Sequence, residues 1–125
     1  MDKKYSIAII DDEVEILNLL SRFLSRNPKF SVANYANPLA ALESLNTSSY
    51  DIILLDIMMP QMNGLEVLEK IKEKNENQKV IMMTAYSTLD KVLKSHKEGA
   101  TNYVMKPFDS LQHLEKKIID ILEKH

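Results

Sequence analysis

The sequence predicts an α/β fold, in which a parallel sheet is covered by helices on both faces. Five short apolar segments alternate with five segments whose apolar residues recur at helical spacing, and the connections between them are short. The run from Ile52 to Leu55 is apolar without interruption, as in a strand buried on both faces. Strands that alternate with helices form parallel sheets with right-handed crossovers. The length predicts one domain, over residues 1–125.

The first half of the chain is predicted to hold two strands and two helices. Residues 5–10 are apolar and rich in β-branched side chains, which favours a strand, and residues 16–24 carry a single apolar helical stripe. Residues 30–35 alternate only partly, so this strand is expected at an edge of the sheet. Asn37-Pro38 supplies an N-cap and a first-turn proline for a helix over residues 39–45.

The second half begins with the central strand, which stops at Asp56 and is followed by Pro60. Asn63-Gly64 is expected to break the chain before the third helix, and Gly99 to end the fourth as a left-handed cap. The remaining predicted elements are a helix over 65–71, a strand over 80–83, a helix over 89–93, a strand over 101–105 and a helix over 111–122.

Composition narrows the possible functions. The chain is 45% hydrophobic and 27% charged, as in soluble globular proteins, and its net charge of -2 gives no electrostatic footprint for nucleic acid. The absence of cysteine excludes disulfides and thiolate ligands. The apolar run near the N-terminus, residues 7–10, is too short for a signal peptide or a membrane span. We therefore expect a cytoplasmic protein without membrane or direct nucleic-acid partners.

Polar side chains follow four of the predicted strands, where open α/β sheets bind their ligands. Asp11 and Asp12 follow the first strand, Asp56 the third, Thr84 the fourth and Lys106 the fifth. Three converging carboxylates repel one another unless a cation joins them. A hard divalent ion, Mg²⁺ or Mn²⁺, prefers such oxygen ligands, whereas zinc and copper are unexpected because no cysteine is present and the histidines have no ligand spacing. Those histidines are expected to face solvent: His96, His113 and His125.

The residues at these strand ends, which we call the rim of the sheet, also predict chemistry on phosphorus. A carboxylate such as Asp56 can attack phosphorus and form an acyl phosphate if the charge on three equatorial oxygens is neutralised. The metal would neutralise one oxygen, the Lys106 ammonium a second, and the Thr84 hydroxyl would donate to a third. Taken singly these residues are commonplace at strand ends. Their joint placement is what points to a phosphoryl site.

These residues also resemble a known family, the receiver domain of two-component response regulators. The resemblance covers essentially the whole chain and follows the order and spacing of the family's motifs. It implies a doubly wound, flavodoxin-like sheet with strand order 2-1-3-4-5 and five helices on both faces. The matching motifs are Asp11-Asp12, Asp56-Ile-Met-Met-Pro60 with Asn63-Gly64 behind it, Thr84-Ala85 and Lys106-Pro107-Phe108.

The resemblance assigns roles to the rim. It implies that Asp56 accepts a phosphoryl group from a phosphohistidine of a sensor histidine kinase or phosphotransfer protein. Asp11, Asp12, Asp56 and the backbone carbonyl of Met58 would hold Mg²⁺. Thr84 and Tyr103 resemble the switch pair, in which the hydroxyl moves toward the phosphoryl group and the ring turns inward. From the residues alone, the favoured reading of Tyr103 is a rim aromatic packed on the sheet.

It also implies an output. The fourth helix, fifth strand and fifth helix would form the surface that a downstream protein or a fused output domain reads, and the phosphorylated form could dimerise. The chain is expected to be a stand-alone receiver or one cut from a longer protein. The Lys106-Pro107 bond resembles the family's cis peptide, although X-Pro bonds favour trans.

Three residues are expected to flank the phosphoryl group: Met58, Ala85 and Tyr86. Met58 is apolar where the family often has a polar residue, and Tyr86 is aromatic. We expect these two side chains to hinder an in-line water and prolong the life of the acyl phosphate, unless solvent reaches the site anyway.

Three other functions were weighed against this one. A haloacid-dehalogenase-type phosphatase would also use an aspartyl phosphate, but it places a second acid two residues after a nucleophile on the first strand and usually has a cap. A flavodoxin-like cofactor site needs a hydroxyl- and glycine-rich phosphate loop, where this chain has Asp11-Asp12-Glu13. A degenerate receiver would lack the acceptor or the lysine, and neither is missing.

Overall fold

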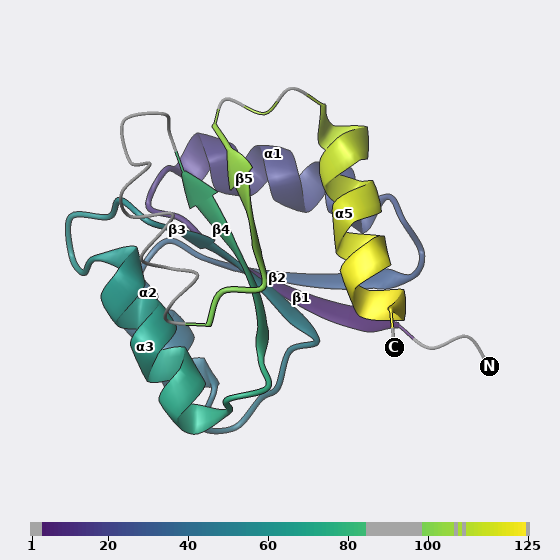
Figure 1. Cartoon of the computed structure of the whole chain (residues 1–125). Coiled ribbons are helices and arrows are strands. Elements are labelled where there is room, and N and C mark those ends of the chain that lie inside the picture. The colour runs from purple at the N-terminus through teal and green to yellow at the C-terminus, as the bar shows by residue number, and fades with distance from the viewer. Residues whose placement is uncertain (1–3, 85–98, 107, 109, 125) are drawn as a thin grey trace.

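The computed structural model describes residues 4–84, 99–106, 108 and 110–124. These residues form five strands and four helices (Figure 1). The helix expected over residues 89–93 lies outside the described residues. In chain order the elements are β1 (Tyr5–Ile10), α1 (Val14–Ser25), β2 (Phe30–Tyr35), α2 (Pro38–Ser44), β3 (Ile52–Asp56), α3 (Gly64–Lys74), β4 (Lys79–Thr84), β5 (Asn102–Met105) and α5 (Leu111–Glu123).

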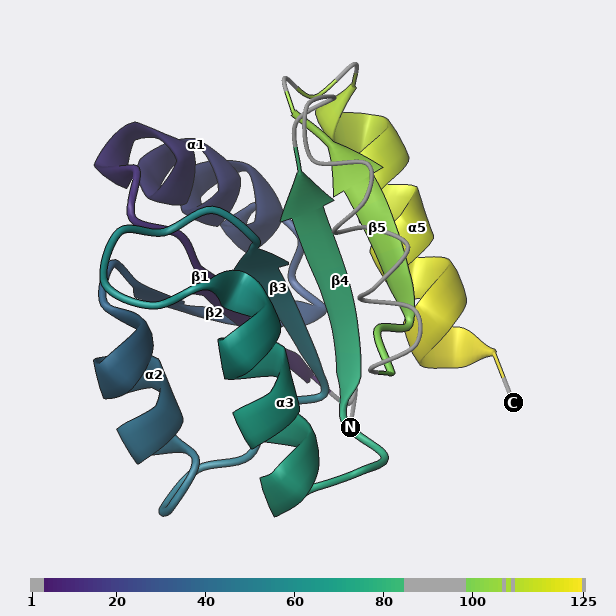
Figure 2. The same ribbon diagram turned by 60° about the vertical axis from the view of Figure 1, so that its left-hand side comes forward.

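The five strands form one parallel sheet in the order β2-β1-β3-β4-β5, which confirms the expected topology (Figure 2). β2 lies at an edge, as its weak alternation predicted, and β3 is central and buried along its whole length. In register, Ile10 of β1 lies beside Leu55 of β3, and Asp56 lies beside Met83 of β4. The carboxyl ends of the central strands therefore meet at one rim.

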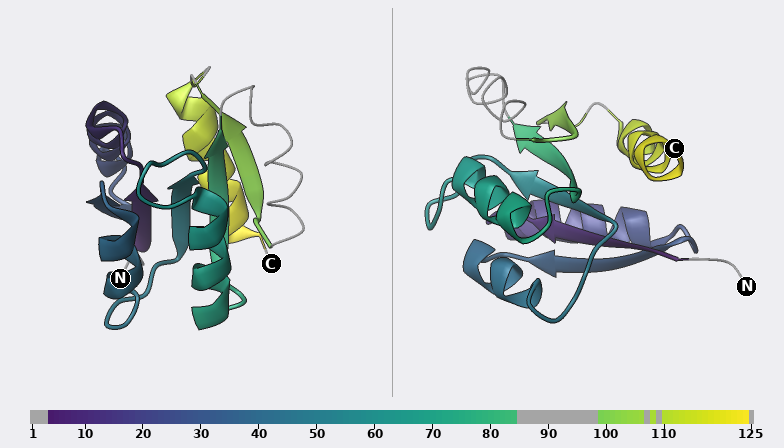
Figure 3. Two further views of the ribbon diagram at one scale, coloured as in Figure 1. Left: turned by 90° about the vertical axis from the view of Figure 1, so that its left-hand side faces the viewer. Right: turned by 60° about the horizontal axis from the view of Figure 1, so that its bottom comes forward.

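Helices cover both faces of the sheet, with α1 and α5 on one face and α2 and α3 on the other (Figure 3). Alternate residues of β3 enter different cores because successive side chains of a strand point to opposite faces. Ile52 and Leu54 belong to the core that also contains Leu17 of α1, whereas Ile53 and Leu55 belong to the core that contains Leu68 of α3. This two-sided burial explains the uninterrupted apolar run.

Several local predictions are confirmed and one is corrected. Asn37 caps α2 by accepting the Leu39 N–H at 2.8 Å. Gly99 has the expected left-handed φ, 100°, whereas the helix that it was expected to end lies outside the described residues. Asp56 and Thr84 are the last residues of β3 and β4, at the strand ends where the sequence placed them.

Asn63-Gly64 does not simply break the chain; it begins α3, since the Asn63 side chain accepts the Leu65 N–H at 2.7 Å. His113 faces solvent, as expected. Within the described ranges, no helix has the length and apolar character needed to cross a bilayer.

The loop after β3 is anchored by two buried side chains and by backbone hydrogen bonds. Ile57 and Met59 are buried in the core beneath α3, so the side chain between them, Met58, points outward and is 52% exposed. The Ile57 N–H donates to the Met83 carbonyl at 3.1 Å, and the Gly64 N–H donates to the Ile57 carbonyl at 2.7 Å. These contacts fix the backbone that follows Asp56.

Gly64 is a point of close backbone approach. A Cβ at this position would lie 2.2 Å from the Asp56 carbonyl oxygen and 2.6 Å from the Ile57 Cα, and both are main-chain atoms that cannot swing aside. The start of α3 can therefore lie against the end of β3 only if this residue has no side chain.

We expect Gly64→Ala to destabilise the fold by roughly 2 kcal/mol or more, because backbone must move to admit the methyl group. Urea unfolding measures the loss, and the amide NMR signals of Ile57 and Met58 should shift with it. Gly99→Ala is the matched control: it strains a left-handed φ at a cost of roughly 1–2 kcal/mol but should leave those two amide signals in place. Unshifted signals in Gly64→Ala would contradict this account.

Candidate functional site

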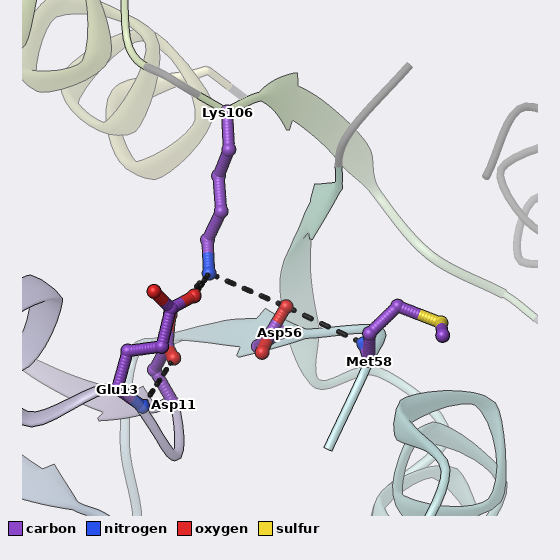
Figure 4. A network of polar contacts seen from close by, with 5 residues as sticks. All are labelled: Asp11, Glu13, Asp56, Met58 and Lys106. Atoms are coloured by element: carbon purple, nitrogen blue, oxygen red, sulfur yellow. Dashed lines mark hydrogen bonds and ion pairs between the residues drawn. The ribbon is translucent and has the colours of Figure 1, made fainter. Parts of the chain in front are cut away.

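The predicted rim residues come together at the carboxyl ends of β1 and β3 (Figure 4). Asp11, Asp12 and Asp56 each offer a carboxylate oxygen, and these oxygens all lie within 4.8 Å of one another. The Lys106 ammonium, which follows β5, reaches the same place and contacts Asp11 and Asp56. Residues from three separate strands thus form one cluster, as the sequence predicted.

Asp11 links the start of α1 to Lys106. Its side chain is fully buried, with one oxygen accepting the Glu13 N–H at 2.9 Å and the other lying 2.7 Å from the Lys106 Nζ. The first bond is an Asx-type turn, which directs the chain from β1 into α1. The second is a charge-assisted hydrogen bond and the shortest of the Lys106 contacts.

Asp56 is held more loosely than Asp11. It is 4% exposed, and its Oδ1 lies 3.4 Å from the Lys106 Nζ and 3.4 Å from the Met58 backbone nitrogen. The Met58 N–H reaches this oxygen because the buried residues on either side of Met58 fix the loop. Long contacts of this kind leave the carboxylate oxygen open to a better partner.

Burial and mutual repulsion set the charges at the site. Burial, with a further contribution from the charge of Asp11, raises the pKa of Asp56 to about 7 although Lys106 and the Met58 N–H act in the opposite direction. Burial also raises the pKa of Asp11. Burial alone would lower the pKa of Lys106, but the hydrogen bond to Asp11 and the charges of Asp56 and Asp11 together raise it. The site is therefore short of positive charge.

This donor set fits a hard divalent cation. Its three side chains offer carboxylate oxygens, which are the ligands that Mg²⁺ and Mn²⁺ prefer, and the part of the cluster made by Asp12 is only partly buried, so an ion can keep some of its water. A second positive charge beside Lys106 would also oppose the burial and the repulsion from Asp11 that raise the pKa of Asp56.

Two further predicted residues border the cluster. Thr84 is 1% exposed at the end of β4, and its carbonyl accepts the Lys106 N–H at 2.6 Å, which aligns the ends of β4 and β5. Tyr103 is half-buried in β5 and packs against the core on the α2 and α3 face. Predictions about other positions lie outside the described residues: Ala85, Tyr86 and Pro107.

The sequence reasoning missed one residue of the cluster. The Glu13 Oε1 lies 3.1 Å from the Lys106 Nζ, so three carboxylates contact one ammonium. The signal was present in the sequence, since Glu13 directly follows the aspartate pair. Its role was not assigned because a glutamate at a helix N-terminus is usually explained by the helix dipole.

The sequence matches a known family of domains along most of its length. The model of the response regulator receiver domain family matches residues 7–119. The sporulation initiation phosphotransferase F of Bacillus subtilis is 38% identical over 103 residues, which cover 82% of each chain. The transcriptional regulatory protein ZraR of Klebsiella oxytoca is 38% identical over 112 residues, but the match covers 88% of this chain and 25% of ZraR. The chain thus spans about a quarter of that longer relative.

Solved structures show the same fold. A CheY-like response regulator receiver domain protein from Methanospirillum hungatei superimposes with a TM-score of 0.90 at 30% identity, covering 98% of this chain and 96% of the other. Because nearly all of both chains superimpose, the match includes the helices as well as the sheet.

We expect Asp56→Asn to stabilise the protein in the presence of a chelator. The raised pKa means that folded Asp56 holds its proton up to about pH 7, whereas the unfolded chain releases it near 3.8, so the wild type loses stability as pH rises between these values. One pKa unit corresponds to about 1.4 kcal/mol, so the gain should be up to a few kcal/mol at about pH 8 and small near pH 4.

Urea unfolding across this pH range measures the effect. Asp120→Asn, at an exposed position of α5, is the control and should change stability little at either pH. A variant at Asp56 that is less stable than the wild type at about pH 8 would contradict the assignment of a strained, buried carboxylate.

Proposed function

This chain is a member of the response regulator receiver domain family, and from that premise we propose that Asp56 accepts a phosphoryl group from a phosphohistidine of a sensor histidine kinase or phosphotransfer protein. Receiver domains are signalling switches of two-component systems and not classical enzymes. The observation that supports Asp56 as acceptor is its position: a buried carboxylate at the centre of the rim, within 3.4 Å of the Lys106 ammonium.

In the proposed reaction, an oxygen of Asp56 attacks phosphorus as the bond from phosphorus to the donor's imidazole nitrogen breaks, which leaves an acyl phosphate on Asp56 and a free histidine on the donor. Lys106 follows the transferring group with its ammonium and offsets the charge on one oxygen. The Met58 N–H, already directed at Asp56, can donate to a second, and the Thr84 hydroxyl to a third.

Mg²⁺ or Mn²⁺ would be held by Asp11, Asp12, Asp56 and the backbone carbonyl of Met58. When bound, such an ion neutralises charge on the phosphoryl oxygens and on the carboxylates. The protein's own contribution is to hold the carboxylates together at some cost in stability, through the rigid ends of β1 and β3. The short distances among the carboxylate oxygens support this assignment.

We propose that Thr84 and Tyr103 carry the signal from the rim. Drawing the Thr84 hydroxyl toward a phosphoryl group would change the space beside β5, and the Tyr103 ring would turn inward to fill it. On the other face of β5, a pocket of about 280 Å³ lies between this strand and α5, lined among others by Val104, Phe108 and Lys117. The region that includes β5 and α5 would then be read by a downstream protein or a fused output domain, or would support a phosphorylation-dependent homodimer.

Acetyl phosphate tests the acceptor directly. Incubation with Mg²⁺ should add a single phosphate by intact mass, and Asp56→Asn should abolish the addition because the nucleophile is lost. Asp51→Asn, at a carboxylate that instead binds Ser6 at the opposite end of the sheet, is the matched control and should still be phosphorylated. Phosphate on Asp56→Asn, or equal labelling with a chelator, would count against the proposed site.

The lifetime of the acyl phosphate tests the flanking positions. Met58 stands over the rim with 52% of its surface exposed, where its side chain can hinder an in-line water. We expect Met58→Asn and Tyr86→Ala to lose phosphate severalfold faster than the wild type, measured as decay of the phosphorylated mass after donor removal. Met62→Asn, further along the same loop, is the control. Unchanged or slower decay in both variants would show that these side chains do not shield the phosphoryl group.

A further inference from the structure

The N-cap residue of α1 does not cap its helix. Ser, Thr, Asp and Asn at this position usually accept a hydrogen bond from the first-turn N–H groups. Glu13 occupies the N-cap of α1, yet its side chain makes no such bond. Its carboxylate instead contacts the Lys106 Nζ at 3.1 Å, across 93 positions of sequence. The Glu13 side chain therefore links the start of α1 to the residue after β5 and does not cap its own helix.

Backbone and side-chain contacts close a ring around this lysine. The Asp11 carboxylate accepts the Glu13 N–H and the Lys106 ammonium, and the Glu13 carboxylate accepts the same ammonium. Figure 4 shows Asp11 and Glu13 together on one side of the ammonium and Asp56 on the other. The Nζ lies nearer to both residues of the first group than to Asp56, at 2.7 and 3.1 Å against 3.4 Å.

We propose that Glu13 is a positioning residue that holds Lys106 on the Asp11 side of the site until Asp56 is phosphorylated. The inference rests on the proposed function, because it concerns how readily the lysine reaches a phosphoryl group on Asp56. Glu13 competes with that group for the ammonium and so favours the unphosphorylated arrangement. Asp11 is fully buried and keeps its bond to Lys106. Glu13 is 59% exposed, so water screens its attraction for the ammonium and the lysine can leave it for a phosphoryl group.

The energy of the contact sets the size of the effect. Exposed ion pairs contribute up to about 1 kcal/mol, so losing the competitor should raise the affinity of the acceptor site for a phosphoryl mimic roughly two- to fivefold. The probe is beryllium fluoride with saturating Mg²⁺, which forms a tetrahedral adduct on a carboxylate. Amide NMR signals of the rim report the midpoint of its titration.

Three variants separate contact from charge. Glu13→Gln removes the charge, and Glu13→Asp keeps it on a side chain that is too short to reach Lys106 and is suited to cap α1 instead. Both should bind beryllium fluoride more tightly than the wild type. Glu15→Gln removes an equal charge from the exposed first turn of the same helix and should leave the affinity unchanged.

A second readout follows the lysine itself. In the free protein the ¹³Cε signal of Lys106 should shift in both Glu13 variants and stay in place in Glu15→Gln, because only the former break the contact. This measurement needs neither metal nor phosphoryl mimic.

Each outcome decides the proposal. A wild type that binds no beryllium fluoride would refute the proposed function, and the inference with it. A wild type that binds, with Glu13→Gln equal or weaker, would overturn the inference alone. Tighter binding in Glu13→Gln without a change in Glu13→Asp, or an equal gain in Glu15→Gln, would mean that net charge acts and the contact does not.

Discussion

The rest of this structure depends on holding two buried carboxylates, Asp11 and Asp56, beside one ammonium. Two negative charges in a low-dielectric site repel each other strongly, and a single lysine cannot satisfy both. Burial, together with the repulsion from Asp11, raises the pKa of Asp56 to about 7. A fold that keeps such a cluster must stabilise it through covalent and backbone restraints, which the parallel sheet provides by ending its central strands at one rim.

Those restraints extend from the sheet into the loop that follows β3. Ile57 and Met59 are buried in the core, so the residue between them is held outward with its N–H toward Asp56. Gly64 lets the first turn of α3 lie against the end of β3. The position of the Asp56 carboxylate is thus set by apolar packing several residues away. Hydrophobic contacts can hold a strained polar group where hydrogen bonds alone would let it turn to solvent.

Much of this could be predicted from the sequence. The uninterrupted run of β3 required two covered faces, and strand-end residues of a parallel sheet share a rim whatever the details of packing, so Asp11, Asp12, Asp56 and Lys106 could be brought together by topology alone. The contact of Glu13 with Lys106 could not, because it depends on the torsions of two long side chains. The ends of β3 and β4 could be placed at Asp56 and Thr84, because a polar side chain follows each apolar run there.

The three contacts of Lys106 differ in the way that a switch requires. Attraction between charges strengthens as solvent is removed, so the fully buried Asp11 holds the ammonium firmly, while the attraction of the 59% exposed Glu13 is screened by water. A phosphoryl group attached to Asp56 would carry more negative charge than the free carboxylate. The lysine can therefore turn about its bond to Asp11, leaving the weaker partner for the stronger one. The difference in burial between Asp11 and Glu13 is thus enough to let the Lys106 side chain move, and the sheet need not rearrange.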